Sequence, residues 1–189
     1  MERFVGHQLT AFETGWGWVG IAMSVRGLAG LIFPEPTRDS ALEKLRTRWL
    51  DGEEVEAGTF ENLIDQIRRY LAGEPVEFDV ALDWLGHAAF LQDVWKVTRS
   101  IPYGETRTYA ELAEEAGRPR AYRAVGQAMA VNPIPLIVPC HRVVRSDGGL
   151  GGYAGGLEVK RRLLDMERTG QGTQAAPGRH GRAQGSGRS

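Results

Sequence analysis

An apolar run interrupted by prolines, residues 134–144, limits how this chain can fold more than any other stretch. Pro135 and Pro139 enclose Leu136 to Val138, a pattern typical of a short buried strand. Pro139 fixes its own φ and favours an extended residue before it, so the residue after it is held at a rigid strand end. That residue is Cys140, the only cysteine of the chain. We therefore expect Cys140 where a core segment reaches a surface loop.

The neighbours of Cys140 favour a reactive thiol. Taken alone, a lone cysteine is more often a small buried hydrophobe, and that alternative stays open. However, His141 and Arg142 follow directly, and a nearby cation lowers the pKa of a thiol from about 8.5 toward neutrality. Adjacent side chains generally point apart, so we expect His141 to act through a bridging water. Glu167, near the end of a helix expected at residues 157–168, is the acid that we expect to orient the imidazole.

The first 83 residues combine strand and helix patterns. Aromatic and β-branched residues on both sides of Arg26-Gly27 are typical of a β-hairpin, and two amphipathic helices follow. After Gly73, apolar and polar residues alternate, which predicts a strand with one solvated face. The expected elements are strands at residues 16–24, 28–33 and 76–82 and helices at residues 37–50 and 60–72. Residues 1–83 therefore predict a small α/β domain, in which no pattern points to catalysis.

Helical patterns dominate residues 84–168. Thr108 and Glu111 form the capping box of a helix that Gly117 ends, and Pro119 opens the next helix. Two short helices joined by a tight turn resemble a helix-turn-helix, although many such hairpins never bind DNA. The expected helices span residues 90–99, 109–116, 119–131 and 157–168. The remaining residues, 169–189, are rich in Gly, Gln, Ser and Arg and predict a disordered basic tail.

The net charge of -1 hides a division along the chain. Residues 1–83 carry 8 basic and 15 acidic side chains, residues 84–168 carry 12 and 9, and the tail carries 3 and none. A basic C-terminal half permits a polyanionic partner. Arg118 lies directly before the 119–131 helix and Arg123 near its start, among small alanines, which suits close approach to phosphates. Ordinary helix packing is the alternative explanation for the alanines.

Several protein classes are excluded or disfavoured by simple features. No apolar run approaches the roughly 18 residues of a membrane span, and the N-terminus lacks a signal-peptide pattern, so we expect a cytoplasmic protein without a membrane partner. One cysteine forbids an intramolecular disulfide and any cysteine-rich zinc site. Residues 146–156 are rich in glycine but lack the Gly-Lys-Ser/Thr ending of a P-loop. A flexible wall beside the thiol is the favoured interpretation.

Short motifs occur in a fixed order along residues 84–168. They are Tyr103-Gly104-Glu105-Thr106, Tyr109, Arg123-Ala124-Val125-Gly126, Asn132-Pro133, Ile137 to Val144, Tyr153-Ala154-Gly155-Gly156 and Leu163 to Glu167. Together they resemble the O6-alkylguanine-DNA alkyltransferases, and Pro-Cys-His-Arg-Val is the most specific of them. The resemblance implies an α+β fold with a ribonuclease H-like N-terminal α/β domain (1–83). The second domain (84–168) is then mostly helical and winged-helix-like, and it carries the helix-turn-helix.

The resemblance also implies DNA repair by direct damage reversal, in which an O6-alkylguanine is flipped out of duplex DNA bound through its minor groove. Cys140 loses its proton through a water to His141, which Glu167 supports, and attacks the alkyl carbon. Tyr109 supplies a proton to the leaving base, and Asn132 holds the turn before the active-site loop. Residues implied to bind the substrate are Val143, Tyr153 and Ala154, and those implied to contact DNA are Arg123, Tyr109, Ala110, Arg118 and Ser146.

We expect each molecule to act once, because a thioether is a poor leaving group and nothing in the sequence resembles machinery for removing it. Arg123 would fill the space that the flipped base leaves in the stack. The implied partner is double-stranded DNA and the expected state is a monomer. No cofactor or metal is implied, since the cysteines of the zinc site in some relatives are absent. Whether O4-alkylthymine is a second substrate stays open.

This sequence departs from the family pattern in places, and two other classes stay open. Ala154 stands where many relatives have Ser, so a hydrogen bond on the O6 side is expected to come from backbone amides instead. Ala88-Ala89 replaces the usual Gly-Thr. An alkyltransferase-like binding protein would lack the nucleophile that Cys140 provides. A cysteine hydrolase would need a histidine within hydrogen-bond reach of the thiol and an oxyanion hole.

Overall fold

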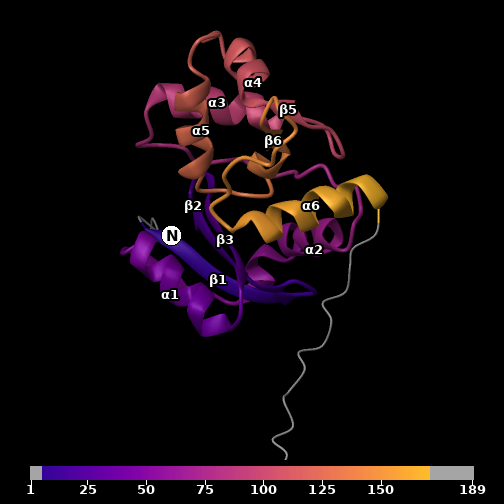
Figure 1. Ribbon diagram of the computed structural model, residues 1–189. Helices are drawn as coiled ribbons and strands as arrows, with labels where there is room; N and C mark the ends of the chain where they lie inside the picture. The colour runs from indigo at the N-terminus through magenta and orange to yellow at the C-terminus, as the bar shows by residue number, and fades with distance from the viewer. Residues whose placement is uncertain (1–5, 171–189) are drawn as a thin grey trace, which may run out of the picture.

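The computed structural model describes residues 6–170, and a four-stranded sheet forms the N-terminal end of the molecule (Figure 1). The strands are β1 (His7–Thr14), β2 (Gly17–Ser24), β3 (Gly27–Glu35) and β4 (Gly52–Glu54), in the order β3-β2-β1-β4. The first three form an antiparallel meander, and β4 runs parallel to β1. The hairpin expected around Arg26-Gly27 is confirmed as β2 and β3, whereas β1 is a strand that the sequence patterns do not predict.

Two helices cover opposite faces of this sheet. α1 (Arg38–Arg48) begins at a capping box of Thr37 and Ser40, and α2 (Glu61–Leu71) follows the short 3-10 helix η1 (Ala57–Phe60). Alternate side chains of β1 point to the two sides: Leu9 packs with α1, whereas Phe12 belongs to the larger core that includes α2. The helices expected at 37–50 and 60–72 are thus confirmed. The larger core continues into the C-terminal half of the molecule.

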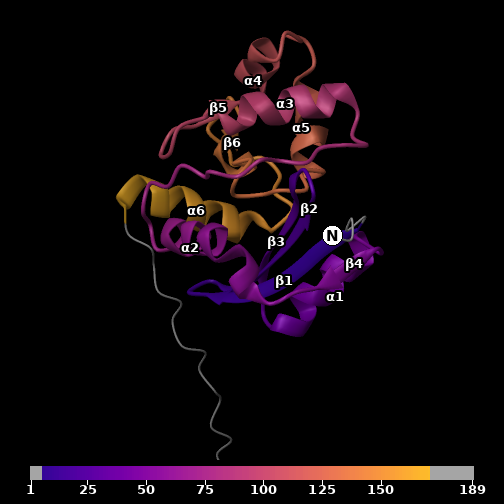
Figure 2. The same cartoon turned by 180° about the vertical axis from the view of Figure 1, so that it is seen from behind.

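Short helices and one small pair of strands make up the C-terminal half. They are α3 (Ala89–Arg99), β5 (Arg107–Thr108), α4 (Tyr109–Glu115), α5 (Tyr122–Ala130), the 3-10 helix η2 (Cys140–Arg142), β6 (Val143–Val144) and α6 (Leu157–Thr169). β5 and β6 pair in parallel. α4 and α5 pack against each other and on α3. Figure 1 and Figure 2 both show α6 returning from this half to lie beside α2 of the N-terminal half.

The turn between α4 and α5 differs from its expected form. Gly117 ends α4 as expected, in the left-handed conformation with φ of 69°. However, α5 begins at Tyr122 rather than at Pro119, because Ala121 N–H donates to the Arg118 carbonyl (2.8 Å) and residues 118–121 form a separate turn. The two helices still form the helix-turn-helix arrangement that their sequences predict.

Residues 76–82 do not form the strand that their alternation predicts. Within this segment only Leu82 makes a bridge, opposite the start of β3. The backbone bonds to side chains instead: Asp79 N–H donates to Gln66 Oε1 (3.0 Å), and Arg99 donates to two carbonyls of the segment (3.1 Å each). The apolar side chains still pack on the core. The alternation therefore predicts correctly which side chains face the core, where they are partly buried, but it does not predict how the backbone is paired.

The strand expected at Leu136 to Val138 is also wrong, since these residues form consecutive turns. Leu136 has φ of 73°, Val138 N–H donates to the Ile134 carbonyl (2.9 Å), and Cys140 N–H donates back to the Val138 carbonyl (2.7 Å). The prolines of this run remove the N–H donors that a sheet needs. Asn132 supplies hydrogen bonds to this backbone in place of a neighbouring strand: its side chain accepts from Ile134 N–H (3.0 Å) and donates to the Val138 carbonyl (2.9 Å).

The helix expected at 157–168 is confirmed as α6, which includes Thr169 and ends at Gly170 in the left-handed conformation. Thr169 is therefore helical, and the rest of the tail expected to be disordered, from residue 171, lies outside the described residues. None of the helices within residues 6–170 is long and apolar enough to cross a membrane.

Asn132→Ala should lower the free energy of unfolding by about 2–4 kcal/mol. It leaves the buried Ile134 N–H without a partner, at about 1–3 kcal/mol, and it removes one of the two hydrogen bonds to the Val138 carbonyl, at about 1 kcal/mol. Urea unfolding followed by tryptophan fluorescence measures the change. Asn62→Ala, on the exposed side of α2, is the control, because the bond of Asn62 to Gln66 (3.1 Å) joins only side chains; it should cost no more than about 1 kcal/mol. Equal losses for the two variants would contradict this account of the turn.

Candidate active site

Cys140 lies at the edge of a hollow of about 860 Å³ between α5, η2 and the glycine-rich loop. The residue is 5% exposed and is the first of η2. Segments far apart in the sequence form the walls, which include Tyr109, Gly126, Met129, Arg145, Tyr153 and Ala154. A concave and mainly apolar site with a few polar groups is typical of a small-molecule or single-base pocket.

His141 is fully buried, and its two ring nitrogens have different surroundings. Nε2 lies 2.8 Å from Glu167 Oε1 and 3.1 Å from the hydroxyl of Tyr70. Nδ1 is buried without a hydrogen-bond partner among residues 6–170. Because the carboxylate can only accept, Nε2 carries the proton of that bond. Nδ1 is then the basic nitrogen, with a lone pair that can take a proton.

The Glu167 carboxylate accepts hydrogen bonds from four residues. Its oxygens receive the Tyr70 hydroxyl (2.5 Å), His141 Nε2, the Gly104 N–H (3.1 Å), and Nε and Nη2 of Arg142 (2.9–3.1 Å). Burial by itself would raise the pKa of Glu167, but the bonds and charges of His141 and Arg142 hold that pKa at about 2. Glu167 is therefore ionised at neutral pH and fixes the imidazole, as expected.

The Cys140 thiol is neutral at rest. Burial raises its pKa above the ordinary value, and the Asn132 side chain, the charge of Lys160 and backbone N–H groups offset this only in part. The expectation that His141 and Arg142 lower this pKa toward neutrality is therefore wrong. For this thiol to act as a nucleophile, a base must therefore take up its proton.

The two neighbours fail to activate the thiol directly because both are committed elsewhere. The Arg142 guanidinium donates to Glu167 and to the Ile101 carbonyl (2.6 Å), so its charge is matched by a carboxylate. Burial lowers the pKa of His141, and the charge of Arg142 adds to this, while Glu167 acts in the opposite direction. A neutral imidazole is a proton acceptor rather than a cation that lowers the pKa of a thiol.

Lys160 of α6 joins two walls of the site. Its ammonium is completely buried and donates to the carbonyls of Val143 (2.6 Å) and Gly152 (3.4 Å). Burial lowers the pKa of Lys160 to about 8, although the nearby Cys140 acts to raise it. β6 and the glycine-rich loop are thus fixed relative to each other beside the thiol.

Tyr109, the first residue of α4, reaches the same hollow from the helix-turn-helix. Burial raises its pKa, and the proximity of Cys140 adds to this, so the phenol stays protonated at neutral pH. Its ring lies against Gly151, where an added Cβ would come within 2.6 Å of the hydroxyl oxygen. Gly151 also has φ of 69°, so the loop requires glycine here for both space and conformation.

The three residues expected to bind the substrate lie near Cys140. Tyr153 and Ala154 line the hollow, and burial raises the pKa of Tyr153 well above its ordinary value. Val143 is buried in β6, with its carbonyl bonded to Lys160. Their roles toward a substrate stay predictions.

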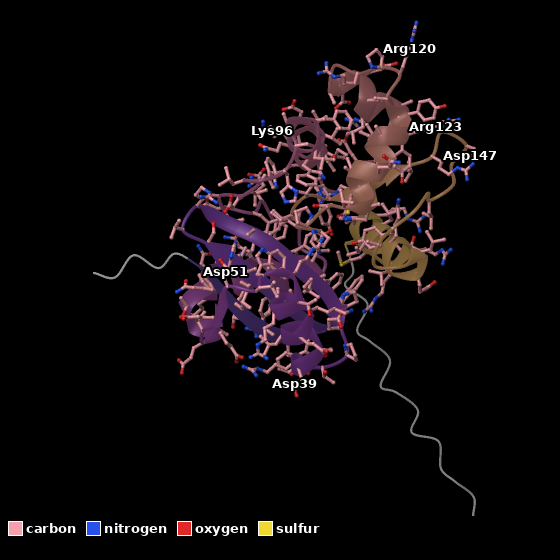
Figure 3. The ribbon with its side chains drawn as sticks, turned by 90° about the vertical axis from the view of Figure 1, so that its left-hand side faces the viewer. Asp39, Asp51, Lys96, Arg120, Arg123 and Asp147 are labelled. Atoms are coloured by element: carbon pink, nitrogen blue, oxygen red, sulfur yellow. The ribbon has the colours of Figure 1, made fainter. Side chains whose placement is uncertain are left out.

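Of the residues expected to contact DNA, Tyr109 is half-buried in the hollow, and the other four are exposed around the helix-turn-helix. They are Ala110 on α4, Arg118 in the turn, Arg123 on α5 and Ser146 in the loop after β6. Figure 3 shows Arg120 and Arg123 projecting outward from this end of the molecule, with Asp147 on the same side as Arg123. Asp147 pairs with Arg145 (2.8 Å), so its charge is matched locally. These assignments also stay predictions.

Comparison with known proteins agrees with this geometry. Two family models match the chain: the ribonuclease-like domain of 6-O-methylguanine DNA methyltransferase over residues 11–84, and its DNA binding domain over residues 89–169. The chain belongs to the O6-methylguanine DNA methyltransferase family. The implied fold class, a ribonuclease-like α/β domain followed by a helical DNA-binding domain, is thereby confirmed. The enzyme class, a methylated-DNA–protein-cysteine methyltransferase, is confirmed as well.

Individual relatives in this family are similar over most of the chain. The methylated-DNA–protein-cysteine methyltransferase of Mycobacterium bovis is 48% identical over 131 residues, which are 69% of this chain and 76% of the relative. The Mycobacterium tuberculosis protein, solved in complex with DNA, is 41% identical with a TM-score of 0.73 and covers 87% of this chain and 94% of its own. A Pyrococcus kodakaraensis family member is 28% identical with a TM-score of 0.63, covering 85% and 98%.

Two residues of this methyltransferase site escaped the sequence patterns. Tyr70 comes from α2, in the domain where no catalytic pattern was found, yet it donates to Glu167 behind His141. A tyrosine on the buried face of an amphipathic helix needs a partner for its hydroxyl, and that requirement is the signal that could have indicated it. Lys160 stands on the inner face of α6, where a lysine is equally unusual.

Glu167→Ala should lower the free energy of unfolding by about 3–5 kcal/mol, because it leaves the buried Arg142 without its counter-charge. Glu158→Ala is the matched control on the same helix, since it breaks only an exposed pair with Arg161 (2.7 Å). That variant should cost no more than about 1 kcal/mol. Urea unfolding gives both values. A loss below about 1 kcal/mol for Glu167→Ala would show that the buried pair does not hold the fold together.

Proposed function

We propose that this protein repairs duplex DNA by moving the alkyl group from O6 of guanine to the sulfur of Cys140. The observation that carries the proposal is the arrangement behind the thiol. His141 is buried and neutral, its Nε2 is bonded to the ionised Glu167, and its Nδ1 has no hydrogen-bond partner in the described part of the chain. This arrangement suits removal of a proton on demand from a thiol that burial keeps neutral.

The reaction proceeds in one displacement. The Cys140 proton passes through a bridging water to His141 Nδ1, and Glu167 stabilises the imidazolium that forms. The thiolate attacks the alkyl carbon, so that the S–C bond forms as the C–O6 bond breaks. The electron pair of the broken bond stays on the guanine, which takes a proton from the Tyr109 hydroxyl. Asn132 holds the turn that presents the sulfur.

Access to the base requires that it leave the helical stack. The helix-turn-helix binds the minor groove, where its small side chains allow close approach and Arg123 fills the space of the flipped guanine. Ala110, Arg118 and Ser146 contact the backbone. Backbone groups of Cys140 and Val143 recognise the guanine edge, while Tyr153, Ala154 and the glycine-rich loop enclose the alkyl side.

The product is a thioether, which is a poor leaving group, so each molecule reacts once. The protein acts as a monomer, with one molecule for each damaged base. A thiol that must stay reduced until it reacts suits a reducing compartment, and we place the protein in the cytoplasm. A cysteine hydrolase is less well supported, because Nδ1 of His141 makes no bond to the thiol that would define a catalytic pair.

Incubation of the full chain with excess duplex DNA containing O6-methylguanine should add one methyl group per protein molecule, measured by intact-protein mass. Cys140→Ala should gain no mass, because it lacks the acceptor sulfur. Peptide mass analysis should place the methyl on Cys140. Tight binding without a mass change would instead make the protein a recognition factor, and the absence of binding would favour the hydrolase.

The transfer rate at saturating duplex should be independent of pH between about 6.5 and 7.5 and should fall below that range, because only the neutral form of His141 accepts the proton. The sign follows from the lowered pKa of His141, which keeps the imidazole neutral down to a pH below its ordinary value of 6.5. Single-turnover quench experiments measure the profile. A rate that rises about tenfold per pH unit across this range would indicate a thiolate formed in solution before reaction.

A further inference from the structure

An exposed tyrosine stands at the entrance of the active-site hollow. Tyr122 is the first residue of α5, and 49% of this residue is exposed. Among the large hydrophobic residues that are exposed within residues 6–170, it is the aromatic one. Exposing a large aromatic side chain is unfavourable in water, so such a residue beside a functional site points to an interaction partner.

The position of Tyr122 along α5 connects it to the site. Tyr122, Gly126, Met129 and Ala130 line the hollow together with Cys140. Their spacing of three and four residues places them on one face of the helix. Ala130 lies eight residues after Tyr122, about 12 Å along the helix axis. Tyr122 therefore stands at the outer end of the face that leads to the thiol.

The ring of Tyr122 also contacts the residue expected to enter the DNA. The guanidinium carbon of Arg123 lies 5.8 Å from the ring centroid, within the range of a cation–π interaction. Figure 3 shows Arg123 directed away from the body of the protein. A long exposed side chain loses conformational freedom when it binds, and a neighbouring ring that already holds it reduces this loss.

The surroundings of Tyr122 select the kind of partner. Arg118, Arg120 and Arg123 lie within six residues of sequence that contain no acidic side chain. All three arginines are exposed, and Figure 3 shows Arg120 and Arg123 projecting from the same end of the molecule. Positive charge interleaved with an exposed aromatic ring is typical of surfaces that bind nucleic acid, where arginines contact phosphates and rings stack on bases.

We infer that Tyr122 is a DNA-stacking residue, whose ring lies on the face of the base next to the gap that Arg123 fills. The inference rests on the proposed function and extends it from one inserted residue to two. Base flipping uncovers two base faces, one on each side of the gap; Tyr122 covers one of them, while Arg123 occupies the vacated position against the other. Both come from the first turn of α5, so a single helix end holds the DNA open.

The test compares Tyr122→Ala and Tyr122→Phe in the full chain, each also carrying Cys140→Ala so that binding is measured without reaction. The ligand is a duplex with one O6-methylguanine and 2-aminopurine as the neighbouring base. Tyr122→Ala should weaken binding about tenfold, the effect of losing one base–aromatic stack. Tyr122→Phe should bind within about twofold of its parent, since the ring is retained.

Fluorescence distinguishes stacking from a mere loss of contact. The 2-aminopurine should be quenched by the parent and by Tyr122→Phe, and it should be brighter with Tyr122→Ala. The dependence of binding on salt should be the same for all three, because no charge is removed. Leu85→Ala, which changes an exposed apolar residue in the loop before α3, should change neither readout.

Two results would overturn the inference. One is binding by Tyr122→Ala within about twofold of its parent with unchanged fluorescence. The other is unchanged affinity together with slower methyl transfer at saturating duplex when Cys140 is present, which would assign Tyr122 to the wall of the pocket instead. Neither result touches the proposed function, because methyl transfer by the unaltered chain tests that separately.

Discussion

The buried carboxylate of Glu167 is the interaction on which the rest of this structure depends. It receives a tyrosine from α2, a backbone amide from the 101–104 loop, and both His141 and Arg142 from η2. A single anion thereby fixes α6, the sheet domain and the active-site turn relative to one another. The same carboxylate determines which nitrogen of His141 is basic, so the packing of the two domains and the protonation of His141 both depend on Glu167.

Local signals predicted most of the helices correctly, and the failures have a common cause. Capping residues such as Thr37 and Thr108 mark helix starts because they bond within their own turn. Strand formation depends on a partner that the local sequence does not specify. Residues 76–82 and 136–138 have the apolar pattern of strands, but their backbone groups bond to Gln66, Arg99 and nearby turns. β1 shows the converse, a strand formed largely because β2 lies beside it.

The active site divides in the same way. Cys140, His141 and Glu167 were proposed as site residues from the sequence, because their neighbours and a family pattern point to them. Tyr70 was not proposed, because its hydrogen bond to Glu167 depends on the packing of α2 against α6, which the local sequence does not show. The sequence also predicted the wrong direction for the pKa shift of Cys140, because two basic residues follow this cysteine. It does not show that His141 is neutral or that Arg142 is paired with the Glu167 carboxylate.

The neutral thiol has a consequence for how long a molecule of this protein stays useful. A protein that can react only once is wasted by every encounter with a soluble electrophile or oxidant, and the thiolate is the form that such compounds attack. Cys140 is 5% exposed and its pKa is raised by burial. In the proposed function, a buried and neutral thiol therefore protects the unreacted protein from such compounds until a base lies against Cys140.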